Sequence, residues 1–356
     1  MFNPDREPIP QDEGNVEEEA MRERMERITR EEFDLQFQQS EKIDLNGEEL
    51  DATSISPENP ISEDWVVVIG GWATGKTAYA EEMYEIAKSG RKVLFLNPDH
   101  GLAPNEGDEE YFKERAVAET IARKAAAVQK VLEEKGIVRA DIVGHSQGAQ
   151  IAAAMGAVHP ELVRRIVLDN PAGMMGKDTR SKLSGRGVIQ AAEEGMQTPG
   201  RMKKAHDLEK QGLIEKGDWK PGKAYVRERL AQTKLMAEKP VFRNVTETAG
   251  VAATDITPLL QDIRDRNKNS DQQIEVVLLN AYSDRIFPEK RIKETLGYEE
   301  SEASQVSEKP FELVDTWAMY SNKGASHNAP YLELPGTLAH ILGGGAPESD
   351  DNEKKS

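Results

Sequence analysis

The sequence predicts an α/β protein whose centre is a mostly parallel, doubly wound sheet with an N-terminal antiparallel hairpin. From Trp65 onward, continuous apolar runs alternate with helical runs, which is the pattern of parallel strands covered on both faces. Upstream, Asn46-Gly47 lies between two short alternating runs, which is typical of a two-residue hairpin turn. These two observations predict the fold class.

Composition narrows the classes of partner and compartment. The chain has 356 residues, a formal net charge of −18 and no cysteine, so disulfides, thiol catalysis and cysteine metal sites are excluded. Its mean hydropathy of −0.65 is polar for one globule and indicates a core with charged peripheral segments. The negative charge repels phosphate backbones, so we expect no nucleic-acid partner. No apolar run reaches membrane-spanning length and no secretory leader is visible, so we expect a cytoplasmic protein without a membrane span.

Residues 1–40 read as a charged N-terminal extension that is disordered or helical. Within it, Met21, Met25 and Ile28 recur at helical spacing in a run rich in Glu and Arg. Two interpretations stay open. The run is either a solvated or transient helix, or a helix that docks on a partner or mediates self-association.

The core is expected in two halves, 41–172 and 251–342. In the first half the strand runs are 65–71, 92–98, 137–143 and 164–173, and the helical runs are 77–90, 111–136 and 149–158. In the second half the strand runs are 274–281 and 311–320, and the helical runs are 257–267 and 335–342. Between the halves, 173–250 lacks a convincing buried strand and is predicted to be an inserted helical cap. Residues 343–356 are predicted to be an acidic, disordered tail.

The segment Gly144–Gly148 reads GHSQG, with an apolar run before it and an Ala-rich helical run after it. This is the G-x-S-x-G pattern in the strand, turn and helix context that a nucleophile elbow requires. The turn holds Ser146 in a strained conformation, and a Cβ at Gly144 or Gly148 would collide with the neighbouring strand or helix. The serine hydroxyl is expected at the end of the sheet, beside the positive end of the next helix.

Outside the insertion, the run from about Asp64 to Leu342 resembles the α/β-hydrolase superfamily. The motifs that carry the resemblance are IGGW (69–72), GHSQG (144–148), HPELVRRIVLDNPAG (159–173), NAYSDRIFP (280–288) and GASHN (324–328). The resemblance implies a Ser–Asp–His triad in that chain order, an oxyanion hole, and a lid inserted after the strand that follows the elbow helix.

Ser146 is therefore the candidate nucleophile, and a serine hydroxyl needs a base within hydrogen-bond reach. His327 is the candidate base, because the superfamily's histidine belongs in the loop after the last strand. Asp284 is the first candidate for the orienting acid and Asp169 the second. The other five histidines are given other positions. His100 could line the pocket, and His145 is expected to point away from the serine. His159 lies at a helix end, His206 in the insertion, and His340 is expected to pack within a helix.

The candidate oxyanion hole consists of the backbone N–H groups of Trp72 and Gln147, aimed at the charge that develops on the substrate oxygen. The expected substrate is a small acyl compound, an ester or thioester, and no metal or organic cofactor is expected.

Residues 70–77 read GGWATGKT, a full match to the phosphate-binding P-loop pattern between a strand and a helix. In that reading Asp169 would bind Mg²⁺. The reading leaves the later motifs unexplained, and the acidic chain shows no basic cluster near these elements beyond Lys76. The sequence thus favours a serine hydrolase. The alternatives are a P-loop nucleotide-binding protein and a catalytically silent α/β-hydrolase-fold binding protein.

Overall fold

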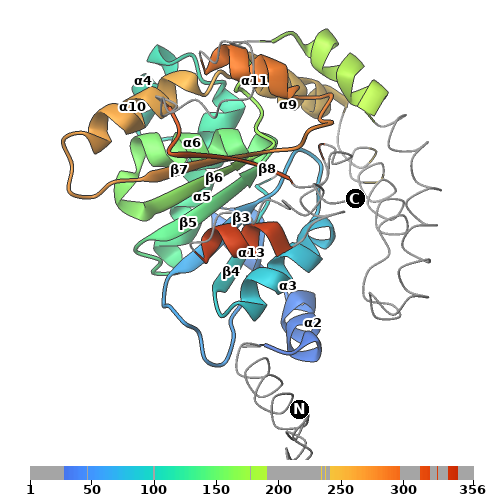
Figure 1. Cartoon of the computed structure of the whole chain (residues 1–356), viewed down its shortest axis with the longest axis vertical. Helices are drawn as coiled ribbons and strands as arrows, with labels where there is room; N and C mark the ends of the chain where they lie inside the picture. Colours follow the sequence, from blue (N-terminus) through green and yellow to red (C-terminus); the bar gives the residue numbers. More distant parts are fainter. Residues whose placement is uncertain are drawn as a thin grey trace, which may run out of the picture.

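The computed structural model describes residues 28–45, 47–98, 101–176, 178–190, 234, 237, 241–296, 313–320, 327 and 336–343. Its strands are β1 (Glu41–Leu45), β2 (Glu48–Ile55), β3 (Trp65–Ile69), β4 (Lys92–Leu96), β5 (Ala140–His145), β6 (Val163–Asp169), β7 (Glu275–Asn280) and β8 (Thr316–Met319). They form one sheet in the order β1-β2-β4-β3-β5-β6-β7-β8 (Figure 1). All neighbours from β4 to β8 run parallel, whereas β1 with β2 and β2 with β4 run antiparallel. The predicted sheet class is confirmed.

The N-terminal hairpin is also confirmed. Strands β1 and β2 pair from Glu41 with Ala52 to Leu45 with Glu48, which leaves a two-residue turn. Gly47 in this turn has φ +91°, a conformation that a residue without Cβ adopts at little cost. Its neighbour Asn46 lies outside the described residues.

Helices cover both faces of the sheet. They are α2 (Arg30–Gln38), α3 (Ala80–Lys88), α4 (Glu106–Glu114), α5 (Glu119–Glu134), α6 (Gln147–Val158), α9 (Val241–Ala253), α10 (Thr257–Asn267), α11 (Glu289–Thr295) and α13 (Gly336–Leu342), with 3₁₀ turns η1 (Lys76–Tyr79) and η2 (Pro160–Leu162). Helices α2, α3 and α13 pack on one face and α5, α6 and α10 on the other, as Figure 1 shows. Residues 180–190 are helical as well.

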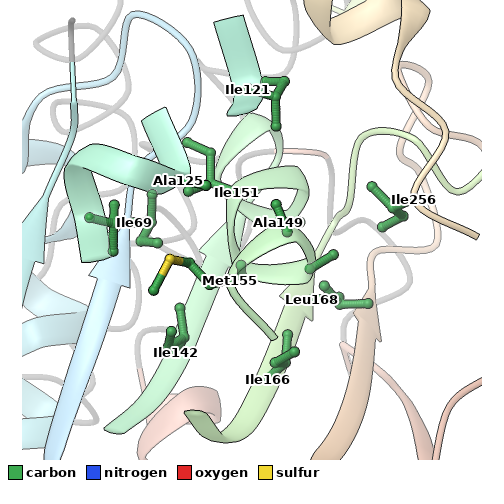
Figure 2. Packing of buried hydrophobic residues seen from close by; sticks show 14 of the residues in the cluster. Ile69, Ile121, Ala125, Ile142, Ala149, Ile151, Met155, Ile166, Leu168 and Ile256 are labelled. Carbon is green, nitrogen blue, oxygen red and sulfur yellow. The ribbon is translucent and has the colours of Figure 1, made fainter. Parts of the chain in front are cut away.

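The larger apolar core lies between the sheet and α6. Every residue of β5 is buried, as expected for a central parallel strand. Ala149 and Met155 of α6 face Ile142 of β5 and Ile166 and Leu168 of β6 (Figure 2). The small alanines let this helix lie close to the strands, and that approach fixes the helix end at which Ser146 stands.

The single helix expected over 111–136 is instead two helices, α4 and α5. Ala116 between them has φ +54°, which no continuous helix allows. The Val117 N–H closes the end of α4 by donating to the Phe112 carbonyl at 2.9 Å, and Val117 itself is buried. Burial of Val117 stabilises the break between the two helices. A run of helix-forming residues does not reveal this tertiary contact.

The end of the N-terminal extension packs on the core of its own chain. Phe33 of α2 is fully buried, and Arg30 makes two hydrogen bonds to Glu81 of α3, at 2.6 and 2.8 Å. Residues 1–27, most of the predicted insertion between 191 and 240, and the tail beyond 343 lie outside the described residues. The predicted domain boundaries therefore remain predictions. In the described part of the chain, no helix is long and apolar enough to cross a membrane.

Candidate active site

The candidate residues gather at the carboxyl ends of the parallel strands, the edge at which ligands bind in open α/β sheets. Ser146 follows β5 with φ +54° and ψ −115°, a strained conformation for a residue with a side chain. Its N–H donates to the Asp169 carbonyl at 3.0 Å, and its carbonyl accepts from Ala149 and Ala172, both at 3.1 Å. Three backbone hydrogen bonds thus fix the turn, while Ser146 stays partly exposed between buried neighbours.

The glycines on either side of Ser146 stand where no Cβ fits. A Cβ on Gly144 would lie 2.3 Å from the Gly148 carbonyl oxygen. A Cβ on Gly148 would lie 2.2 Å from the carbonyl oxygen of Ile69, at the end of β3. Both distances are far below van der Waals contact, so α6 can start this close to β3 and β5 only with glycine at both positions.

Asp284 and His327 meet in a buried hydrogen bond. His327 Nδ1 lies 2.8 Å from Asp284 Oδ2, and both side chains are almost wholly buried. The other carboxylate oxygen, Oδ1, accepts from the backbone N–H groups of Ile286 at 2.7 Å and Phe287 at 3.0 Å. One oxygen of Asp284 therefore holds its own turn and the other orients the imidazole, which packs edge-on against the Phe287 ring.

The described residues show no hydrogen bond between Ser146 Oγ and His327. Bonds of this kind are often long in a ligand-free enzyme and shorten when substrate binds. The His327 backbone is nevertheless held beside the elbow, because its carbonyl accepts from Asn170 Nδ2 at 3.1 Å and from His145 Nε2 at 2.9 Å.

The second acid candidate, Asp169, does not contact His327. Its Oδ1 accepts from the Tyr320 hydroxyl at 3.1 Å in a fully buried site. Burial raises the pKa of the Asp169 carboxyl well above its ordinary value, and the nearby Asp284 charge raises it further. A carboxyl that resists ionisation is poorly suited to stabilise an imidazolium, so the geometry favours Asp284.

The glycine-rich loop after β3 closes over the elbow. A Cβ on Gly71 would come within 3.2 Å of Ser146 Cβ and 3.1 Å of His145 Nδ1. The Gly71 N–H donates inward to the Tyr79 hydroxyl at 2.8 Å. The backbone N–H groups of Trp72 and Gln147 have no acceptor in the ranges that the structure describes. Both candidate oxyanion donors are thus available to a ligand.

Lys76 of the P-loop match is engaged elsewhere. Its ammonium donates to the Phe37 carbonyl at 2.6 Å and to Ser40 Oγ at 2.7 Å, and it lies 4.8 Å from the centroid of the Phe37 ring. A P-loop lysine must instead reach the nucleotide phosphates. Here the lysine attaches the end of α2 to the core.

Of the other described histidines, His159 lies 3.5 Å from Asp108 and His340 belongs to α13. His100 and His206 lie outside the described residues. His145 is buried, and its Nδ1 lies 2.9 Å from the Tyr79 hydroxyl. Across the described ranges, no group of three or more His, Asp or Glu side chains is arranged to hold a metal ion.

A buried ion pair beside the elbow was missed by the sequence analysis. Lys124 of α5 donates to Glu247 of α9 at 2.8 Å and to Gln147 Oε1 at 3.0 Å. The signal was present: Lys124 follows Ile121 by three residues and precedes Val128 by four, so it shares their apolar face. Tyr79 and Asn170 were missed as well, and nothing in their local sequence reveals their distant partners.

A family model described as the alpha/beta hydrolase fold matches residues 64–185. Among curated proteins, a 2-hydroxymuconate semialdehyde hydrolase from Pseudomonas sp. (strain CF600) is 34% identical over 112 residues. That match covers 31% of this chain and only 37% of the relative's length.

Solved structures extend the likeness to most of the chain. The enol-lactonase from Burkholderia xenovorans LB400 superposes with a TM-score of 0.53 at 15% identity, over 85% of this chain and 98% of that one. MGS-M2, an α/β hydrolase from a Medee basin deep-sea metagenome library, gives a TM-score of 0.54 at 15% identity, over 85% and 96% of the two chains. At such identities the likeness shows the fold alone.

Proposed function

We propose that the chain, which matches the alpha/beta hydrolase fold family model over residues 64–185, is a serine hydrolase that cleaves an ester, thioester or related acyl bond. The observation that supports this most is the buried Asp284–His327 hydrogen bond, held beside an elbow whose serine has a strained backbone and a partly exposed side chain. The proposed substrate is a small acyl compound, and residues 173–250 are proposed to form the cap that shapes its pocket.

The proposed reaction proceeds through an acyl-enzyme. Ser146 Oγ attacks the acyl carbon while His327 Nε2 accepts the hydroxyl proton, and Asp284 keeps the other ring proton on Nδ1. The carbonyl oxygen becomes an anion between the Trp72 and Gln147 N–H groups. His327 then returns the proton to the departing alcohol or thiol. Water repeats the sequence on the acyl-enzyme, releasing the carboxylic acid and restoring Ser146.

A fluorophosphonate probe tests the nucleophile directly. The wild type is expected to be labelled at Ser146, and Ser146→Ala is expected to lose both labelling and turnover of chromogenic acyl esters. Lys76→Ala is the matched control and is expected to keep both, since its ammonium holds α2 rather than substrate. Equal labelling of the wild type and Ser146→Ala would refute the proposal.

A series of esters of increasing acyl length, with lactones and thioesters included, measures the pocket. Lactones belong in the series because one similar structure is named an enol-lactonase. A folded wild type that neither reacts with the probe nor hydrolyses any member would favour the silent binding protein. Magnesium-dependent nucleotide binding that Lys76→Ala abolishes would favour the P-loop protein.

A further inference from the structure

Three buried hydrogen bonds run from the glycine-rich loop through the elbow to the loop of His327. The Gly71 N–H lies 2.8 Å from the Tyr79 hydroxyl, and that hydroxyl lies 2.9 Å from His145 Nδ1. On the other side of the ring, His145 Nε2 lies 2.9 Å from the His327 carbonyl oxygen. Tyr79 is fully buried and His145 is 2% exposed, so water does not compete for these bonds.

Chemistry fixes the direction of each bond. The His327 carbonyl can only accept, so the proton of His145 sits on Nε2. Nδ1 is then an acceptor, and the Tyr79 hydroxyl donates to it. The Gly71 N–H can only donate, and it finds the remaining lone pair of the Tyr79 oxygen. All three donors are matched to acceptors, so the chain of bonds has a single consistent arrangement.

We propose that Tyr79 and His145 are positioning residues that hold the oxyanion loop and the His327 loop in register with Ser146, an inference that rests on the proposed function. We call the hydrogen bonds that join Gly71, Tyr79, His145 and the His327 carbonyl the brace. His145 directly precedes Ser146 in the chain, so the middle of the brace moves with the nucleophile. One end fixes Gly71, whose neighbour Trp72 supplies an oxyanion donor. The other end fixes the backbone of the residue proposed as the base.

The charge state of His145 suits this task. Burial lowers the pKa of His145 well below its ordinary value, and the neighbouring His327 lowers it further. His145 therefore stays neutral and keeps one tautomer. The ring centroids of the two histidines lie only 4.9 Å apart, so a charged His145 would oppose the imidazolium that His327 becomes during the reaction.

Tyr79→Phe removes the shared hydroxyl without emptying the core, since the ring and its contact with Phe95 remain. Misplacing catalytic groups by about 1 Å can cost about 100-fold in rate. We expect kcat to fall about 10- to 100-fold with KM changed less than about twofold, because the buried Tyr79 hydroxyl bonds Gly71 and His145 rather than substrate. Tyr320→Phe is the matched control: its equally buried hydroxyl bonds Asp169 and neither loop.

Two His145 variants separate the ends of the brace. Gln places an amide N–H where Nε2 stood but no acceptor where Nδ1 stood, so His145→Gln is expected to keep the bond to His327, to lose the bond to Tyr79, and to have a kcat between those of the wild type and Tyr79→Phe. Asn reaches only the Nδ1 position, so His145→Asn is expected to lose the bond to His327 and to resemble Tyr79→Phe. Adding Tyr79→Phe to His145→Asn should cost less than it does in the wild type, since the two changes interrupt one chain.

The same proteins are compared by amide hydrogen exchange, which does not depend on activity. Faster exchange over residues 70–74 is expected in Tyr79→Phe and not in Tyr320→Phe. If the wild type is active but Tyr79→Phe matches Tyr320→Phe in both kcat and exchange, the inference is refuted and the proposed function stands. If the wild type neither labels nor hydrolyses, the proposed function fails and the catalytic role of the brace fails with it.

Discussion

The buried pair between Lys124 and Glu247 makes a quantitative prediction. The two charged groups lie 2.8 Å apart, with side chains only 5% and 4% exposed. At an effective dielectric constant of about 20, their attraction is about 6 kcal/mol. Glu247→Gln keeps the shape of the side chain and a hydrogen-bond acceptor but removes the negative charge. The buried ammonium of Lys124 then has no opposite charge to offset the cost of its desolvation. We expect the free energy of unfolding to fall by about 3–5 kcal/mol.

The assay is urea unfolding at pH 7, followed by far-ultraviolet circular dichroism. Two further variants sharpen it. Lys124→Met combined with Glu247→Leu should recover most of the loss, because an apolar pair of similar volume commonly replaces a buried ion pair without penalty. Glu109→Gln removes the partner of Lys113 in an exposed pair on α4 and should change nothing measurable. If Glu247→Gln proves as harmless as Glu109→Gln, the reasoning from burial is refuted.

Three shorter predictions follow. Gly148→Ala places a Cβ 2.2 Å from the Ile69 carbonyl oxygen. It should abolish probe labelling and lower the free energy of unfolding by at least about 2 kcal/mol. Gly107→Ala on α4 is the control and should not destabilise the protein, because its added Cβ meets nothing within 4 Å. Burial raises the pKa of Glu82 well above its ordinary 4.5, so the folded state holds a proton that the unfolded state releases, and stability should fall as pH rises above 4.5. Glu82→Gln should flatten that fall, and an unchanged slope in unfolding measured from pH 4.5 to 8 would contradict the assignment. Lys76→Ala should keep ester turnover within about twofold while loosening α2, and limited proteolysis after Phe37 would report the loosening.

The sequence by itself determined what depends on near neighbours in the chain. Apolar runs marked the strands, Asn46-Gly47 marked the hairpin, and the glycines around Ser146 marked a turn that tolerates no Cβ. Each of these is a local steric or periodic property, which neighbouring residues carry wherever they stand. The break in the helix at Ala116 was not predicted, because helix-forming residues surround Ala116 and the break depends on the burial of Val117.

Only the tertiary structure decided which distant groups meet. Asp169 ends β6 and Asp284 lies in the turn after β7, yet Asp284 alone reaches His327, 43 residues further on. Tyr79 finds His145 across 66 residues, and Lys76 finds Phe37 across 39. Such pairings depend on the order of the strands in the sheet and on the face that each side chain occupies. The local sequence around one residue determines neither of these. The fold class could therefore be predicted from the sequence, whereas the hydrogen bonds between distant residues of the candidate site could not.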